Sequence, residues 1–267
     1  APSTWANHAI ISPYEPGSVV KPLFAAAAVD AGVVDWDTSI DCENGTYYAH
    51  RGGRITDHGQ SYASLSVAEI NIKSSNIGMA KIGEMLGNEK LHAVTQMYGF
   101  GQRSGIELPG EEPGMIRRLS SWDGYSTRRV PFGQEMSATS LQVAMAFAAV
   151  ANGGELMEPI LIDRVVAGGE ILRQSEPTVV RRVLKTKTAR DTLDVMACVV
   201  EEGTGKKARM LQYRSFGKTG TAQIAGPGGY VDGAYVGSFV GGAPLNTPRA
   251  VCLISVYWPD RSKAYYG

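Results

Sequence analysis

Three short motifs bring together side chains that are able to carry out acyl transfer. In chain order they are Ser18-Val19-Val20-Lys21, Ser74-Ser75-Asn76 and Lys218-Thr219-Gly220-Thr221. A serine hydroxyl is a poor nucleophile until a neighbouring base takes its proton. Residues three apart lie on the same face of a helix, so a helical first motif puts Lys21 within reach of Ser18. The first motif therefore predicts a serine nucleophile and a lysine base.

The lysine base must be neutral to accept a proton, which requires a lowered pKa. Burial and a nearby cation both lower the pKa of a lysine, and Lys218 is a candidate for that cation. Lys218, Thr219 and Thr221 also offer a charge and two hydroxyls for a substrate carboxylate. The third motif is therefore a candidate for binding the substrate.

Backbone N–H groups are the expected donors to the oxyanion of an acyl-transfer transition state. At a helix N-terminus, Ser18 directs its own N–H toward an incoming carbonyl oxygen. A second N–H has to come from an edge strand, and residues 218–221 are predicted to form one. Gly220 permits that strand to approach closely.

Each motif taken alone is weak evidence. A Ser-x-x-Lys spacing occurs by chance about once in a chain of this size. The second motif alone is more often a polar turn between helices. Another Ser-x-x-Lys, at Ser215 and Lys218, is rejected because residues three apart on a strand point to opposite faces. All three motifs, in this order and in the expected helix, loop and strand, are expected in about one chain in a few hundred.

Helices are expected to carry the first two motifs. An alanine-rich apolar run over residues 19–34 predicts a buried helix with Ser18 at its start. A capping box, Ser66-Val67-Ala68-Glu69, opens a second helical segment. Polar residues 73–76 interrupt its apolar face, so we expect two helices joined by a tight loop there, the second ending at Gly87. Further helices are expected over residues 88–98, 139–152 and 187–202.

The last third of the chain is rich in β-forming residues. Runs over 213–224, 235–243 and 249–258 are separated by turn residues and predict an antiparallel meander. Residues 35–62 are expected to form a loop with a short hairpin, and residues 99–125 a loop. Helices first and strands last predict an α+β fold with helices packed on a sheet.

Composition excludes several classes of function. Lys plus Arg and Asp plus Glu both number 26, so the net charge is zero, which argues against non-specific nucleic-acid binding. The three cysteines form no Cys-x-x-Cys pair, so no metal site and no cofactor are expected. His58 is expected in a solvated loop. No apolar run approaches the roughly 20 residues that span a bilayer, so the chain as given is expected to be soluble.

The motifs and their surroundings resemble class B penicillin-binding proteins, most of all those of the division and sporulation type. The resemblance covers residues 7–267. It rests on the stretches Tyr14-Glu15-Pro16-Gly17-Ser18-Val19-Val20-Lys21-Pro22, Lys73-Ser74-Ser75-Asn76-Ile77-Gly78, Tyr98-Gly99-Phe100-Gly101, Phe132-Gly133-Gln134, Glu201-Glu202-Gly203-Thr204-Gly205 and Gly217-Lys218-Thr219-Gly220-Thr221-Ala222-Gln223.

The resemblance implies a β-lactamase/transpeptidase-like α+β fold, with an antiparallel sheet flanked by helices plus a mainly helical subregion. It implies that residues 1–267 form one penicillin-binding transpeptidase domain, without the first strands and last helix that family members usually have. It also implies a full-length parent anchored at the extracytoplasmic face of the bacterial cytoplasmic membrane.

The resemblance further implies a peptidoglycan D,D-transpeptidase. Ser18 attacks the bond between the two terminal D-alanines of a wall stem peptide, and Lys21 is the general base. Ser74 and Asn76 relay protons and hold the substrate amide. The terminal carboxylate is received by the third motif, Lys218, Thr219, Gly220 and Thr221. The oxyanion hole is formed by the backbone N–H groups of Ser18 and Thr221.

The implied partners follow from that reaction. They are stem peptides ending in D-Ala-D-Ala, an acceptor amine from a neighbouring stem, β-lactams that acylate Ser18 as substrate mimics, and a membrane glycan polymerase reached through the full-length parent. No nucleic acid is expected.

Three alternatives remain open. A D,D-carboxypeptidase or a β-lactamase would share the nucleophile and pass the acyl group to water, and a non-catalytic domain would only sense β-lactams. A β-lactamase needs a second base to activate water. Carboxylates between the second and third motifs are expected to be surface charges, namely Glu107, Glu111, Glu112, Asp123 and Glu135.

Overall fold

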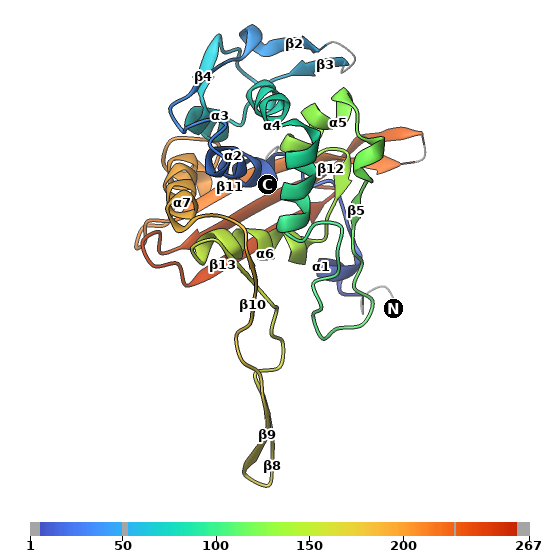
Figure 1. Ribbon diagram of the computed structural model, residues 1–267, viewed down its shortest axis with the longest axis vertical. Helices are drawn as coiled ribbons and strands as arrows, with labels where there is room; N and C mark the ends of the chain where they lie inside the picture. Colours follow the sequence, from blue (N-terminus) through green and yellow to red (C-terminus); the bar gives the residue numbers. More distant parts are fainter. Residues whose placement is uncertain (1–5, 50–52, 227, 261–267) are drawn as a thin grey trace.

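A three-stranded antiparallel sheet crosses the middle of the molecule (Figure 1). This computed structural model describes residues 6–49, 53–226 and 228–260. The strands are β11 (Phe216–Gly226), β12 (Gly229–Ala243) and β13 (Ala250–Tyr257), hydrogen-bonded in that order. The predicted meander is therefore confirmed. Within the described residues β11 is an edge strand, which leaves one side of it available to a ligand.

Alternation of side chains assigns one face of this sheet to the core. Val236 and Val240 of β12 are buried, and in the register Val240 is paired with Leu253 of β13. On the opposite face Ile254 and Val256 are exposed. Successive strand residues point to opposite faces, so this pattern places the helices against the Val240 face.

A buried helical segment carries the first motif. It begins with the 3₁₀ turn η2 (Gly17–Val20) and continues as α2 (Lys21–Asp30). The expected helix over 19–34 is thus present but ends four residues early. Gly32 has φ +65°, which is incompatible with a continuing helix. In Figure 1, α2 lies between the sheet and α4 (Asn76–Met97).

The second motif lies at a junction of two helices, as expected. The first is α3 (Val67–Lys73), and its N-cap Ser66 forms the predicted capping box with Glu69. Ser74 then adopts a left-handed conformation with φ 62° and ψ 40°, which ends α3. After Ser75, α4 begins, and Gly87 interrupts it with φ 77° and ψ 165°. The predicted stop at Gly87 is therefore a break between two helical halves.

The remaining helices complete the shell around α2. The predicted helices over 139–152 and 187–202 are α6 (Ser140–Ala151) and α7 (Thr186–Glu201). Two short α-helices, α1 and α5, had no counterpart among the expectations, and α5 begins at the end of the segment 99–125 that was expected to be a loop. The short elements are α1 (His8–Ile11), α5 (Gly124–Arg129), η3 (Glu43–Gly45), η4 (Leu119–Ser121), η5 (Val130–Phe132) and η6 (Lys206–Ala208).

Several two-stranded antiparallel sheets lie outside the three-stranded sheet. The hairpin expected within residues 35–62 is formed by β2 and β3, whereas the hairpin of β8 and β9 was not expected and projects from the molecule (Figure 1). Every residue of β8 and β9 is exposed, so neither strand shows a buried face that a pattern can reveal. The strands are β1 (Ser39–Asp41), β2 (Thr46–Ala49), β3 (Gly53–Thr56), β4 (Ser64–Ser66), β5 (Met115–Ile116), β6 (Met136–Ser137), β7 (Glu155–Met157), β8 (Arg164–Ala167), β9 (Glu170–Gln174) and β10 (Val179–Arg182).

One cluster of buried apolar side chains joins α2, α4, α6, α7 and the sheet. Phe24, Phe147 and Phe216 are fully buried members from three of these elements. The whole of α2 except its last turn is enclosed by this cluster, which holds the first motif in place. In the described part of the chain, no helix combines the length and the apolar character that crossing a bilayer requires.

Candidate active site

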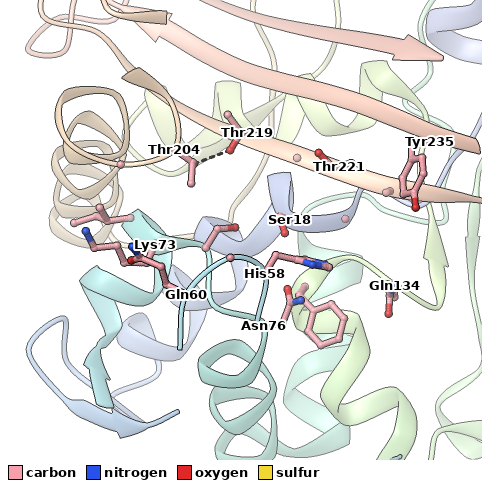
Figure 2. A pocket seen from close by; sticks show the side chains of 18 of the residues that line it. Ser18, His58, Gln60, Lys73, Asn76, Gln134, Thr204, Thr219, Thr221 and Tyr235 are labelled. Carbon is pink, nitrogen blue, oxygen red and sulfur yellow. Dashed lines mark hydrogen bonds between the residues drawn. The ribbon is translucent and has the colours of Figure 1, made fainter. Parts of the chain in front are cut away.

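A cleft of about 440 Å³ runs beside β11 and contains residues of all three motifs. Figure 2 shows Ser18, Asn76, Thr219 and Thr221 around it, on three different elements. The Ser18 side chain lines the cleft, while its chain neighbours Gly17 and Val19 are buried. The structure therefore brings the three motifs together around the half-buried Ser18.

The first motif is wound as a 3₁₀ turn, which controls how its side chains lie. The Lys21 backbone N–H donates to the Ser18 carbonyl oxygen, closing that turn. In a 3₁₀ helix residues three apart are eclipsed, so the side chains of Ser18 and Lys21 project from the same face. This supports the predicted pairing by geometry tighter than that of the expected α-helix.

Lys21 is fully buried beneath the cleft. Its Nζ donates to the Ser74 carbonyl oxygen at 2.5 Å and to Asn76 Oδ1 at 2.8 Å, and lies 3.3 Å from Ser74 Oγ. Burial, and next the charge of Lys218, lower the pKa of Lys21 well below its ordinary value, and Asp57 partly opposes this. A neutral lysine has two N–H groups and one lone pair. The carbonyl and the amide take the two N–H groups, so the lone pair is left for a hydroxyl proton.

Lys218 is buried on the other side of Ser74. Its Nζ donates to Ser74 Oγ at 2.9 Å and to the Thr219 carbonyl oxygen at 2.9 Å. Burial lowers the pKa of Lys218 to about 7. The Ser74 hydroxyl therefore lies between two amines and is able to accept from Lys218 while donating to neutral Lys21. The prediction that Lys218 lowers the pKa of Lys21 is supported.

The conformation of the second motif is fixed from outside by Asp57, a residue the sequence did not single out. Asp57 Oδ1 accepts from the backbone N–H groups of Asn76, at 2.6 Å, and Ile77, at 3.1 Å. Asp57 Oδ2 accepts from Ser75 Oγ at 2.7 Å. The carboxylate thus caps the N-terminus of α4, where negative charge is favoured. It holds Asn76 where its amide oxygen meets Lys21.

Two glycines allow β11 to approach the nucleophile turn. A Cβ at Gly220 would lie 2.9 Å from both the backbone N and the Cβ of Val19, and a Cβ at Gly17 would lie 3.0 Å from the Cβ of Ala222. Such distances exclude a side chain at either position without a shift of the backbone. The close approach predicted for Gly220 is therefore present, and it brings the edge strand beside the backbone of Ser18.

The strand presents two hydroxyl-bearing residues to the cleft. Thr219 and Thr221 both line it, and the Thr221 Oγ1 atom is buried and has no hydrogen-bond partner among the described residues. Lys218 is fully buried and is absent from the lining. The charge expected to meet a carboxylate therefore acts from beneath Thr219 and not from the wall of the cleft.

Nearly the whole sequence matches one protein family. A family model described as the penicillin binding protein transpeptidase domain matches residues 2–267. This chain belongs to the penicillin-binding protein transpeptidase family. Within the family it is 33% identical to penicillin-binding protein PbpB of Mycolicibacterium smegmatis, over 96% of this chain and 41% of that protein. It is also 33% identical to stage V sporulation protein D of Bacillus subtilis, over 98% of this chain and 41% of that protein.

Solved structures of the family share the fold. Penicillin-binding protein 3 of Mycobacterium tuberculosis, complexed with aztreonam, matches with a TM-score of 0.87 and 32% identity, covering 94% of this chain and 58% of that one. The transpeptidase domain of Burkholderia pseudomallei penicillin-binding protein 3 matches with a TM-score of 0.86 and 32% identity, covering 96% and 75%. The predicted fold class and the resemblance to class B division and sporulation proteins are confirmed. The chain spans about two fifths of the length of the two curated relatives named above.

Several residues line the cleft of this penicillin-binding transpeptidase domain without having been predicted. No spacing rule points to them, because they come from separate loops, from the end of α3 and from β12. Lys73, Gln134 and Glu202-Gly203-Thr204-Gly205 lie in stretches that were matched to the family but were given no role. His58 is exposed in a loop, as expected, but it also faces the cleft (Figure 2). The unpredicted lining residues include His58, Gln60, Lys73, Gln134, Glu202, Thr204 and Tyr235.

The five carboxylates considered as a second base do not line the cleft. Four of them are engaged elsewhere: Glu107 pairs with Arg173, Glu111 binds Ser104 and Gly105, Asp123 caps α5, and Glu135 pairs with Arg117. The expectation of a surface charge is wrong for Glu111, which is buried because its carboxylate accepts from Ser104 and Gly105. Glu202, at the end of α7, is the acidic residue that does line it. Over the residues the structure describes, no three His, Cys, Asp or Glu side chains gather as a metal site would require.

Proposed function

We propose that this chain is the catalytic domain of a peptidoglycan D,D-transpeptidase that works through an acyl-enzyme on Ser18. One observation carries the proposal: the Ser74 hydroxyl bridges buried Lys218 and Lys21, and Lys21 closes the 3₁₀ turn that carries Ser18. Two buried amines that hold one hydroxyl between them serve no evident purpose in stability, since each costs desolvation. They do serve proton transfer at a nucleophile.

In the proposed reaction the Ser18 Oγ attacks the carbonyl carbon between two terminal D-alanines. Its proton passes to the lone pair of Lys21, and the carbonyl electrons move to the oxygen, which the Ser18 and Thr221 backbone N–H groups receive. The C–N bond then breaks, and the leaving amine takes a proton from Lys21 directly or through the Ser74 hydroxyl. Asn76, held by Asp57, keeps its amide oxygen on Lys21.

The terminal carboxylate of the donor is proposed to bind along β11 at Thr219 and Thr221, with Gly220 between them. The unpartnered Thr221 Oγ1 supports this, because a buried hydroxyl without a partner is costly unless a ligand supplies one. Protonated Lys218, just beneath, adds favourable charge. A β-lactam that carries a carboxylate fits the same arrangement.

The acyl group is then proposed to pass to an amine of a neighbouring stem peptide. The carboxylates Glu107, Glu111, Glu112, Asp123 and Glu135 lie outside the cleft lining, which disfavours a hydrolase that activates water with one of them. We propose that the parent protein works at the extracytoplasmic face of the membrane together with a glycan polymerase.

Labelling with penicillin tests this function. Mass spectrometry of proteolysed adduct is expected to place the label on the peptide containing Ser18, and Ser18→Ala is expected to abolish it. Ser215→Ala is the matched control, because Ser215 belongs to the rejected Ser-x-x-Lys spacing. Label on Ser74 or Ser215 with Ser18 unmodified would overturn the assignment.

A chase separates the transpeptidase from two of its alternatives, the β-lactamase and the sensing domain. After removal of excess drug, the adduct followed by intact mass is expected to survive for many minutes, because none of the five carboxylates considered as a second base lines the cleft. Loss within seconds, with catalytic destruction of the drug, would identify a β-lactamase. A stable adduct without release of D-alanine from a D-Ala-D-Ala peptide plus amine would indicate a sensing domain.

A further inference from the structure

We propose that Thr204 is a positioning residue that orients the Thr219 hydroxyl toward the substrate carboxylate. The inference rests on the proposed function and adds a residue to it. Thr204 lies in the loop after α7, in a different part of the chain from the three motifs. Its role follows from a contact, from the way its loop is held, and from the number of protons that the two hydroxyls carry.

The contact joins two residues of the cleft wall. Thr204 Oγ1 and Thr219 Oγ1 are 2.7 Å apart, and both residues line the cleft (Figure 2). Thr219 is 5% exposed, so its hydroxyl has little access to bulk water. In the residues the structure covers, no other hydrogen bond engages either hydroxyl. The two hydroxyls are thus paired with each other at the wall of the cleft.

The loop that carries Thr204 is held against the end of α7. The Gly203 N–H donates to the carbonyl oxygens of Cys198 and Val199, and the Gly205 N–H donates to Val199 as well. A Cβ at Gly203 would lie 2.7 Å from the carbonyl oxygen of Ile72 in α3. The loop is therefore packed between α7 and the helix that leads into Ser74, and Thr204 is presented by a fixed backbone.

The number of protons on the two hydroxyls determines which one donates to the other when a substrate binds. Each hydroxyl has one proton, and a carboxylate only accepts hydrogen bonds. If Thr219 donates to the carboxylate, its oxygen is free to accept, and Thr204 is the donor in place. The result is a chain in which Thr204 donates to Thr219 and Thr219 donates to the carboxylate. Hydrogen bonds in such a chain strengthen one another, and the charged acceptor makes the last one strong.

The test compares acylation by two forms of one penicillin, the free carboxylate and its methyl ester. Thr204→Val removes the donor at nearly constant volume, and its second-order acylation rate with the carboxylate form is expected to fall about 3- to 10-fold. With the ester the fall is expected to be less than about twofold, because a neutral acceptor gains less from the chain. Thr204→Ser is expected to restore the rate.

Two further variants keep the test specific. Thr192→Val removes a buried hydroxyl that donates to the Thr188 carbonyl within α7, and it controls for a general weakening of that helix. Thr219→Val combined with Thr204→Val completes a double-mutant cycle. The loss in the double variant is expected to be close to that of Thr219→Val alone, because Thr204 acts through Thr219.

The outcomes distinguish this inference from the function on which it rests. If penicillin fails to acylate Ser18 of the unsubstituted protein, the proposed function and the role of Thr204 are both overturned. If the unsubstituted protein is acylated normally, any of three results overturns the inference alone. These are an unchanged acylation rate in Thr204→Val, an equal slowing of acylation with the acid and the ester, or an effect on the rate that adds fully to that of Thr219→Val.

Discussion

The Ser74 hydroxyl accounts for much of the chemistry at the scale of single residues. It is 2.9 Å from one buried amine and 3.3 Å from another, and the two lysines differ in what surrounds them. The pKa of Lys21 is lowered by burial and by its neighbour, whereas that of Lys218 is lowered by burial to about 7. Below about pH 7 Lys218 carries charge, and the neutral form of Lys21 is favoured when its neighbour is charged.

Replacement of Lys21 tests the neutral base. Acylation by penicillin is expected to rise with pH through a pKa well below 10.5, because the rate follows the deprotonated fraction of Lys21. A guanidinium stays charged, so Lys21→Arg is expected to slow acylation by at least about 100-fold. Lys187→Arg, on the exposed face of α7, is the matched control. Acylation of Lys21→Arg at the parental rate would mean that another group takes the proton.

Glu202 is the carboxylate to test as a hidden hydrolytic base, since it lines the cleft. Glu202 lies two residues before Thr204, whose hydroxyl contacts that of Thr219, so we expect no contact with the water that attacks the Ser18 ester. Glu202→Gln is therefore expected to change the lifetime of the penicillin adduct by less than about twofold. A lifetime extended by about 100-fold, the usual effect of losing a general base, would contradict this.

At the scale of elements, three separate pieces of chain have to meet at fixed positions. The 3₁₀ turn η2 presents Ser18, the junction of α3 and α4 presents Ser74 and Asn76, and the edge strand β11 presents Thr219. The junction of α3 and α4 is the least stable of these pieces by itself, because Ser74 adopts a left-handed backbone conformation that is unfavourable for a residue other than glycine. Asp57 supplies that support from the loop after β3.

Removal of the Asp57 carboxylate tests this support. Asp57→Ala leaves two N–H groups and one hydroxyl at the start of α4 without their acceptor, and is expected to lower the free energy of unfolding by about 1–2 kcal/mol. Asp57→Asn keeps one acceptor oxygen and is expected to retain more of that stability. Urea denaturation measures both.

The charge of Asp57 has a second, separable effect. Asp57 raises the pKa of Lys21, so Asp57→Asn is expected to lower that pKa further. The rise of the acylation rate with pH then moves to lower pH. Movement to higher pH in Asp57→Asn would show that the charge does not act on Lys21 in this way.

At the scale of the whole molecule, two buried lysine amines affect the stability of the fold. Lys21 and Lys218 are both fully buried next to the apolar cluster that surrounds α2. Burial disfavours the charged form, so each lysine binds its proton more weakly in the folded than in the unfolded protein. Stability therefore depends on pH in a defined direction.

Between about pH 7 and pH 9.5 the free energy of unfolding is expected to rise with pH. In that window the unfolded chain keeps the Lys218 proton, while the folded protein, with a pKa of about 7, has lost it. One such lysine contributes a slope of up to about 1.4 kcal/mol per pH unit. Lys218→Met is expected to reduce the slope and leave the contribution of Lys21, whereas Lys207→Met, at an exposed position, leaves the slope unchanged. A flat or negative slope in the unsubstituted protein would show that burial does not lower the pKa of Lys218 as stated.

The sequence by itself determined the elements and the residue types at the site. Apolar periodicity predicted α2, α6 and α7, the capping box at Ser66 predicted the start of α3, and alternating runs predicted the three-stranded meander. These features are local, because caps, turns and side-chain periods depend on residues a few positions apart. The three motifs could be recognised for the same reason, because the residues of each motif are close together in the sequence.

Only the tertiary structure decided which groups meet. The position of Lys218 beneath the cleft, the cap that Asp57 places on α4, and the pair formed by Thr204 and Thr219 all join residues from separate elements. No period or spacing encodes such contacts, because they depend on how helices pack on the sheet. The lowered pKa of both lysines is likewise a property of burial, which exists only once the core around α2 has closed.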